Sequence, residues 1–353
     1  MSGGVDSSVA AALIKARGYA AIGVTLLLQP DTIGAPGEEA LKGIESARRV
    51  ARTLGIPHHV FDLHEEFEKK VIEPFCREYA SGRTPNPCIL CNRTIKFGAL
   101  LSRAREMGAD HLATGHYAQV IYDEERRRFL LKKGRDGRKD QSYFLFGLSQ
   151  DQLRSVIFPL GALKKTEVKE MAKECGLSVS DRKESQEICF IPGNDYVSFV
   201  KQRVSDAGGE GPIVSTKGEL LGRHSGILSF TVGQRRGLNI AKGYPLYVVS
   251  VDKSSNTVVV GTKEQGCRKD LIASGINWIA MESLRQPLVT NARIRYKHPE
   301  NSARVIPLSE DRVKVEFLEP QMAVTPGQAV VFYEDDMVLG GGWIDQPRLP
   351  LQE

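Results

Sequence analysis

The stretch Ser2-Gly3-Gly4-Val5-Asp6-Ser7-Ser8 indicates how the first part of this chain folds. Glycines let the backbone turn so that several N–H groups point at one anion, and Ser7 and Ser8 add hydroxyl donors. A helix beginning at Ser7 or Ser8 and running through Lys15 would present its positive end to the same anion. No GK[ST] ending of a Walker A loop follows, so the stretch predicts a phosphate-binding loop of another kind. An ordinary glycine-rich helix start is the alternative.

Downstream of this loop, the pattern alternates between strands and helices. Ala20–Leu28 is a continuous apolar run, as in a strand buried on both faces. Glu38–Leu54 has apolar residues at a 3.6-residue period and predicts a helix. The alternation predicts an α/β domain with a parallel sheet and helices on both faces. The other expected elements are strands at His59–Leu63 and His111–Thr114, helices at Glu66–Tyr79 and Ile95–Met107, and a proline-containing loop at Ser81–Asn92.

The glycine-rich segment begins at the second residue, whereas a phosphate loop normally follows a strand. We therefore expect the first strand to be missing from the sheet, either because the start is assigned too late or because the chain is truncated. Extending the chain upstream is then expected to raise its melting temperature.

Past about residue 200, short strands separated by turns replace this alternation. Val313, Val315 and Phe317 alternate with charged residues, which is the period-2 pattern of a half-buried strand. This pattern of short strands predicts a small β-barrel or sandwich in the C-terminal third of the chain. We expect three domains: a catalytic domain at 1–200, a small central domain at 201–265 entered through a linker at Ala207–Gly211, and a barrel at 266–353. The other expected strands are Ile227–Val232, Leu246–Val251, Thr257–Val260, Arg293–Tyr296, Arg304–Pro307, Ala329–Tyr333 and Val338–Leu339.

Composition excludes several classes of protein. The chain has 353 residues, 41% hydrophobic and 26% charged, which predicts folded domains rather than disorder. Its 48 basic and 43 acidic residues leave a net charge of +5, which permits a nucleic-acid partner without demanding one. No apolar run approaches the roughly 20 residues of a membrane span, and no signal peptide opens the chain. Six cysteines are too few for a disulfide scaffold, so a reducing, cytoplasmic location with thiol chemistry is expected.

Cys88 and Cys91 form a C-x-x-C motif within the expected loop. A structural zinc site would need two more ligands at similar spacing. A thioredoxin-like pair would need a helix to start at the first cysteine, whereas the expected helix begins several residues later. A third interpretation is sulfur chemistry with Cys189 as the partner.

Cys189 lies close to Arg182 and Lys183, which would lower the pKa of its thiol and raise its reactivity. Its apolar neighbours Ile188 and Phe190 favour a buried structural cysteine as the alternative. The three remaining cysteines belong to no motif and are interpreted as inert small hydrophobic residues: Cys76, Cys175 and Cys267.

Ordered motifs cover nearly the whole chain and together resemble the tRNA-specific 2-thiouridylase family. The first of them, SGGVDSS, resembles the PP-loop of the ATP pyrophosphatase superfamily. The others are TPNPCILCNRTIKFG (84–98), ATGHYA (113–118), KDQSYFL (139–145), KESQEICFI (183–191), HSGILSFTVGQRRGL (224–238), RIRYKH (293–298), AVTPGQAVVFY (323–333) and LGGGWI (339–344).

The resemblance implies an enzyme that replaces the C2 oxygen of the wobble uridine with sulfur in tRNAs for Lys, Glu and Gln. ATP adenylates that oxygen, because an amide-like carbonyl oxygen is a poor leaving group. Cys189 receives a persulfide sulfur, and Cys91 acts as the nucleophile that releases it by forming a disulfide with Cys189. The pocket must exclude water, and the base must flip out of the anticodon stack. The implied partners are tRNA and a persulfide carrier or cysteine desulfurase.

The resemblance also assigns individual residues. Asp6 would help to hold Mg²⁺ near the pyrophosphate. The ATP site would include Met1, Ser2, Gly3, Gly4, Val5, Asp6, Ser7, Leu26 and Gly115. The tRNA site would include Asn86, Pro87 and Cys88 at the target base, and Lys139, Asp140, Gln141, Arg295, Tyr296, His116 and Gln328 elsewhere on the RNA. Each has a simpler interpretation: Lys139 and Arg295 as solvated charges, His116 as a packing residue, Leu26 as plain core.

Cys88 departs from the family pattern, which commonly has Asp at this position. Cys88, Cys91 and Cys189 could instead hold an iron–sulfur cluster with one iron open to sulfide. The iron content and visible absorbance of anaerobically purified protein would decide between the two routes. Two other classes also remain open: an ATP-dependent ligase acting on a small acid, and an RNA-binding module that no longer turns over ATP.

Overall fold

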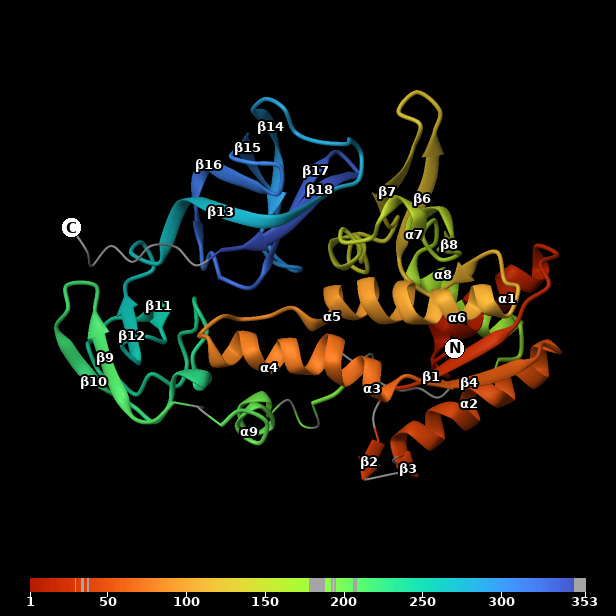
Figure 1. Cartoon of the computed structure of the whole chain (residues 1–353), viewed down its shortest axis with the longest axis horizontal. Helices are drawn as coiled ribbons and strands as arrows, with labels where there is room; N and C mark the ends of the chain where they lie inside the picture. Colours follow the sequence, from red (N-terminus) through yellow and green to blue (C-terminus); the bar gives the residue numbers. More distant parts are fainter. Residues whose placement is uncertain are drawn as a thin grey trace.

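The computed structural model places three parts in an elongated arrangement (Figure 1). An α/β part comes first, a small β-sheet lies at the opposite end, and a β-barrel packs above the helices between them. Among the described residues, no helix combines the length and the apolar character needed to cross a bilayer. The structure describes residues 1–28, 30–32, 35–36, 38–177, 188–191, 193, 195–205 and 208–345.

Helices dominate the α/β part. The predicted helix Glu38–Leu54 is present with the same bounds, and helical structure runs without a break from His64 to Ala80. The α-helices are α1 (Val5–Ala16), α2 (Glu38–Leu54), α3 (His64–Phe67), α4 (Glu73–Ala80), α5 (Pro87–Leu90), α6 (Leu101–Glu106), α7 (Gln150–Arg154), α8 (Lys165–Glu174) and α9 (Tyr196–Lys201). Shorter helical stretches are the π-helices η1 (Glu68–Ile72) and η2 (Cys91–Leu100) and the 3-10 turn η3 (Ser142–Phe144).

The parallel sheet is present as two separate pairs. Strand β1 pairs with β4, and β5 pairs with β8, both in parallel. Met1 donates its amino group to the Val24 carbonyl and accepts a 2.6 Å bond from the Thr25 hydroxyl, so the first residue lies along β1. The strands of this part are β1 (Gly23–Leu27), β2 (Pro30–Thr32), β3 (Ala35–Pro36), β4 (His58–Asp62), β5 (Leu112–Ala113), β6 (Ala118–Asp123), β7 (Arg128–Lys133) and β8 (Val156–Ile157).

The prediction of a loop over Ser81–Asn92 is wrong in its second half. Helical structure begins at Pro87 and continues through α5, η2 and α6 to Glu106. Proline is favourable at the first helical position, since its missing N–H would be unpaired there and its φ is already helical. Asn86 before it is extended, with φ −116° and ψ 92°. Cys88 and Cys91 therefore lie in the first turns of a long helix.

The central part is a four-stranded sheet in the order β10-β9-β12-β11, in which β12 runs parallel to β9. The expected strand at Ile227–Val232 is wrong, because Ile227–Ser229 form a 3-10 turn after Gly226, whose φ is +146°. Of the expected linker, Ala207 lies outside the described residues, and Gly211 already begins β9. The strands are β9 (Gly211–Ser215), β10 (Leu220–His224), β11 (Tyr247–Asp252) and β12 (Thr257–Gly261).

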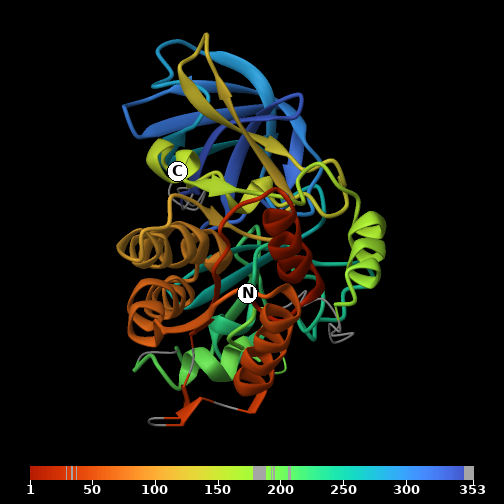
Figure 2. The same ribbon diagram turned by 90° about the vertical axis from the view of Figure 1, so that its right-hand side faces the viewer.

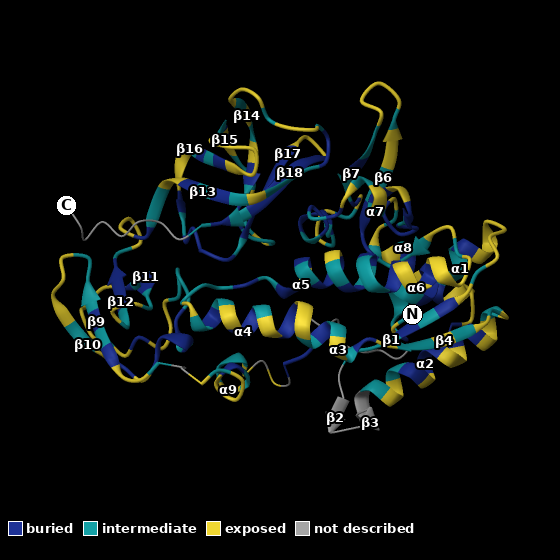
Figure 3. Ribbon diagram, viewed as in Figure 1, coloured by how far each residue is buried: buried dark blue, intermediate teal, exposed yellow. Residues whose placement is uncertain are grey.

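The C-terminal part is a closed barrel of six strands in the order β13-β16-β15-β14-β17-β18, and β13 closes it by pairing with β18. Buried side chains of its strands form one hydrophobic cluster, and Figure 3 colours much of the barrel ribbon as buried. The expected strand at Arg293–Tyr296 is wrong beyond Arg293, where β14 ends in a turn. The strands are β13 (Cys267–Trp278), β14 (Leu288–Arg293), β15 (Asn301–Pro307), β16 (Arg312–Met322), β17 (Ala329–Glu334) and β18 (Met337–Ile344).

The barrel sheet continues into the α/β part. Strand β18 pairs with β7 through Met337 opposite Lys132 and Val338 opposite Leu131, and β7 pairs in turn with β6. Figure 2 shows this hairpin crossing the barrel. The first part of the chain therefore contributes two strands to the sheet of the last.

Candidate active site

The phosphate loop is held tightly against helix α2. Gly3 has φ +75°, and a Cβ added there would lie 2.7 Å from the Cβ of Ser46. The Ser46 hydroxyl donates a 3.1 Å bond to the Gly3 carbonyl. Helix α1 begins at Val5, earlier than expected, so Ser7 and Ser8 lie inside its first turn. Both donate their hydroxyls to the Gly4 carbonyl, at 3.1 and 2.8 Å, and so shape the loop.

Asp6 is paired with protein groups. Its carboxylate accepts bonds of 2.7 and 2.8 Å from the Lys165 ammonium and one of 2.8 Å from the Tyr117 hydroxyl. Sequence reasoning missed both partners. Tyr117 lies in the quoted ATGHYA motif, whereas nothing local marks Lys165, which is 159 residues away in the chain.

These groups do not form a magnesium site by themselves. The carboxylate of Asp6 is already neutralised by Lys165. No group of three or more His, Cys, Asp or Glu side chains in the described parts of the chain could hold a metal ion. We therefore assign no reaction step to Mg²⁺.

The segment after β5 packs directly on this loop. A Cβ at Gly115 would lie 2.8 Å from the backbone carbon of Asp6, so only glycine fits there. The next residue, His116, is 8% exposed and lies between the rings of Phe97 and Phe158. Burial holds the pKa of His116 well below its ordinary value, so the ring is neutral. The expectation that His116 lies at an RNA surface does not fit its burial, and the packing interpretation does.

Cys88, Cys91 and Cys189 approach one another. Cys91 is buried in the same apolar cluster as Phe190 and Ile191, the residues that follow Cys189. Burial is the main cause that raises the pKa of Cys88 and Cys91, and a charge on Cys189 raises both further, so the three thiols interact electrostatically. Leu26 of β1 packs against the same cluster. All three are free thiols in this structure.

The expected lowering of the Cys189 pKa is wrong. Arg182 and Lys183, on which it depended, lie outside the described residues. Burial raises the pKa of Cys91 to about 11, and surrounding protein also raises the pKa of Cys88 and Cys189, although both side chains reach solvent. The cation that opposes burial at all three thiols is Lys96, another residue that sequence reasoning missed.

The iron–sulfur alternative does not fit this arrangement. The three cysteines, all in described segments, do not form a group that could hold a metal ion. We therefore derive no step through a cluster.

One of the residues expected to contact tRNA, Tyr296, packs against the α/β part. The Tyr296 ring lies 4.4 Å from that of Phe144, which follows the Lys139–Gln141 segment. The Asn92 amide donates 3.1 Å to the Phe144 carbonyl, which links this surface to the helix of Cys91. Gln328 is not a free surface residue, since its amide bonds the carbonyls of Thr84 at 2.9 Å and of Pro85 at 3.2 Å.

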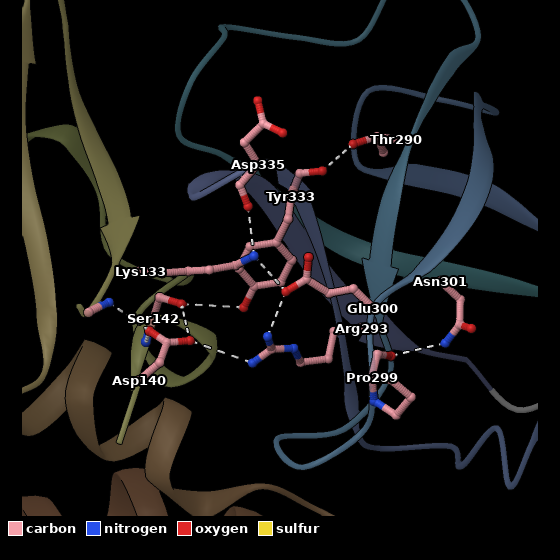
Figure 4. A network of polar contacts seen from close by, with 11 residues as sticks. Lys133, Asp140, Ser142, Thr290, Arg293, Pro299, Glu300, Asn301, Tyr333 and Asp335 are labelled. Atoms are coloured by element: carbon pink, nitrogen blue, oxygen red, sulfur yellow. Dashed lines mark hydrogen bonds and ion pairs between the residues drawn. The ribbon is translucent and has the colours of Figure 1, made fainter. Parts of the chain in front are cut away.

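The side chains of Asp140 and Gln141 form hydrogen bonds with other groups of the protein. Asp140 is 3% exposed and accepts bonds from Gly134 and Ser142. It also pairs with Arg293 of the barrel at 3.5 Å, and Arg293 pairs with Glu300 at 2.6 Å (Figure 4). The Gln141 side chain accepts a 3.0 Å bond from the Tyr117 backbone. The buried Asp140–Arg293 pair joins the two domains, and its members are close in sequence to Lys139 and Arg295.

Three family models match the chain in order: "tRNA methyl transferase HUP domain" over residues 1–193, "tRNA methyl transferase PRC-barrel domain" over 197–262 and "Aminomethyltransferase beta-barrel domain" over 268–344. The tRNA-specific 2-thiouridylase MnmA of Syntrophotalea carbinolica is 51% identical over 98% of this chain and 97% of its own length. The chain belongs to the tRNA-specific 2-thiouridylase family. The enzymes of the same name from Halothermothrix orenii and Moorella thermoacetica are 48% and 50% identical, each over 98% of both chains.

Membership in the 2-thiouridylase family explains the loop at the N-terminus, because the PP-loop of this family uses ATP. The three matched segments agree with the three parts of the structure: an α/β domain, a small β domain and a closed barrel.

Proposed function

We propose that this chain is a tRNA-uridine 2-sulfurtransferase that thiolates the wobble uridine of tRNAs for Lys, Glu and Gln. The observation that carries the proposal is that Cys91 and Cys189, far apart in sequence, interact electrostatically, and that Cys91 shares an apolar cluster with Phe190. The proposed partners are tRNA and a persulfide-bearing donor, either a carrier or a cysteine desulfurase.

The first step is activation of the base. The N–H groups of the loop around Gly3 and Gly4, at the positive end of α1, bind the phosphates of ATP. The C2 oxygen of uridine attacks the α-phosphorus, the α–β bond breaks, and pyrophosphate leaves. Lys165 fixes the carboxylate of Asp6 at the first turn of α1 and so holds the loop in shape.

The second step moves sulfur. A persulfide on Cys189 is attacked at its inner sulfur by the Cys91 thiolate, which forms the Cys91–Cys189 disulfide. The terminal sulfur leaves with the electron pair as hydrosulfide and attacks C2, and AMP departs with the former C2 oxygen. A dithiol or other thiol reductant must reduce the disulfide before the next cycle.

The tRNA is held by residues from both domains. Lys139 and Arg295 supply positive charge for phosphates, and Tyr296 supplies a ring beside Phe144. Asn86, Pro87 and Cys88 at the start of α5 then face the extruded base next to Cys91. Because the ion pairs of Arg293 join the domains below this surface, its two halves keep a fixed spacing.

The proposal predicts a specific product. The protein is incubated with tRNA, ATP and a persulfide donor, and the tRNA is digested to nucleosides for mass spectrometry. We expect wobble uridine to gain the mass difference between sulfur and oxygen, together with AMP release that depends on tRNA. A gain of one methylene group would instead support the methyl transfer named in the family models, and AMP release without tRNA would support a ligase.

Replacing Gly115 with alanine tests the ATP site. The added Cβ would meet the Asp6 backbone at 2.8 and 3.0 Å, and neither backbone can yield without displacing the loop. We expect binding of a non-hydrolysable ATP analogue to weaken by about tenfold or more in calorimetry. Gly137→Ala is the control, because no atom lies within 4 Å of its added Cβ. Equal affinity of the Gly115 variant and the wild type would place the nucleotide elsewhere.

A further inference from the structure

Lys96 lies on the same helix as Cys91, in the π-helical stretch Cys91–Leu100. Hydrogen bonds in a π-helix join residues five apart, so Lys96 lies one turn after Cys91 and on the same face. In an α-helix at 3.6 residues per turn, the two side chains would point about 140° apart. The π-helical stretch therefore turns this ammonium group toward the face that carries the cysteine, and such stretches are frequent at functional sites.

In the described part of the chain, the charge of Lys96 has no acidic partner. The side chain is half-buried, and it forms no ion pair with a carboxylate of the described residues. The titratable groups within its electrostatic reach are Cys88 of α5, Cys91 of η2, Cys189 of the adjoining segment and the neutral ring of His116. A half-buried cation without a counter-charge is unfavourable. Among the described groups, the three cysteines can supply that counter-charge, and a bound substrate can supply another.

We propose that Lys96 is the counter-ion of the sulfur anions in this reaction, first of the Cys91 thiolate and then of the released hydrosulfide. The inference rests on the proposed function and adds to it a residue that stabilises charge at the reacting sulfur.

The movement of negative charge during sulfur release explains why a fixed cation would favour this step. Cys91 loses its proton to solvent before it attacks. The new S–S bond to Cys189 forms as the bond to the terminal sulfur breaks, so one negative charge moves from Cys91 to the hydrosulfide. Lys96 acts electrostatically on both Cys91 and Cys189, so it stabilises the negative charge at the start and at the end of this step.

The test measures thiol reactivity in the absence of tRNA and ATP. The reduced protein is alkylated with iodoacetamide from pH 6 to pH 10 in wild type and Lys96→Met, and the peptides containing Cys91 and Cys189 are quantified separately by mass spectrometry. We expect both titrations to shift upward in Lys96→Met, with about three- to tenfold slower alkylation at pH 8. Lys96→Arg, which keeps the charge, should recover most of the rate.

Arg93→Met is the matched control, because Arg93 is exposed on the same helix and does not act on any of the three thiols. Lys96→Gln is tested together with Lys96→Met. If one of the two variants folds poorly, the other still reports the effect of removing the charge. Unchanged titrations in the neutral variants, with weaker binding of tRNA or ATP, would overturn the proposal and make a phosphate the partner of Lys96. The alkylation assay contains no substrate, so its result is independent of the thiolation assay. An unchanged alkylation profile would overturn the role of Lys96 alone, and an absence of 2-thiouridine would overturn the proposed function alone.

Discussion

Cys189→Ser is expected to abolish formation of 2-thiouridine while the protein stays folded. A serine hydroxyl cannot carry a persulfide, so no sulfur reaches the activated base. Cys91→Ser is expected to have a similar effect, since the persulfide is then not released by disulfide formation. We expect each variant to lose more than about a hundredfold in thiolation rate, measured by nucleoside mass spectrometry. Adenylation comes first in the proposed sequence, so tRNA-dependent AMP formation is expected to survive better than thiolation.

Two further variants control this experiment. Cys175→Ser changes an exposed cysteine after α8 and is expected to retain full activity. Cys88→Ser separates the two sulfur routes, because the persulfide route needs only Cys91 and Cys189, whereas a cluster would lose a ligand. Near-normal turnover of Cys91→Ser and Cys189→Ser on a small acid would instead identify an ATP-dependent ligase.

Arg293→Met is expected to lower the free energy of unfolding by about 3 kcal/mol. The guanidinium is 15% exposed and pairs with Asp140, which is 3% exposed, and with Glu300, which is 17% exposed. Removing one member of a buried ionic network leaves the other charges without compensation. Lys133 still pairs with Glu300 at 2.7 Å, so the loss should lie at the low end of the range for such pairs.

The measurement is urea unfolding followed by tryptophan fluorescence, since Trp278 and Trp343 both lie in barrel strands. Arg312→Met is the control, because its pair with Asp345 is half exposed and should contribute less than about 1 kcal/mol. Adding Asp140→Asn to Arg293→Met should recover part of the loss. Equal midpoints for the Arg293 and Arg312 variants would contradict a structural role for the buried network. We also expect weaker tRNA binding in Arg293→Met, because the two halves of the proposed RNA surface would no longer be fixed.

Local signals predicted much of the fold. The helix Glu38–Leu54 has its predicted bounds because its apolar period is regular and Gly55 and Pro57 follow it. The period-2 pattern of Val313–Phe317 correctly indicated a barrel strand. The prolines before Cys88 were misleading. The composition of Ser81–Asn92 indicated a loop, whereas Pro87 begins a helix.

Local sequence patterns could not predict contacts between residues far apart in the chain. Nothing near Lys165 marks it as the partner of Asp6, and nothing near Asp140 marks its pairing with Arg293. The family resemblance predicted Cys91 and Cys189 as a pair, and their electrostatic interaction agrees with that prediction without testing it. Their surroundings reversed the expected pKa shift of Cys189, because the effect of burial depends on the fold and not on neighbours in sequence.

The pairing of β18 with β7 has a consequence for dissecting the molecule. A fragment that stops before β13 would leave the backbone of β7 unpaired along one side, next to the apolar residues Leu130 and Leu131. Such an open margin readily recruits strands from other molecules. We therefore expect the isolated α/β fragment to aggregate, and tRNA thiolation in this family to be inherited as one indivisible unit and not by shuffling of its barrel.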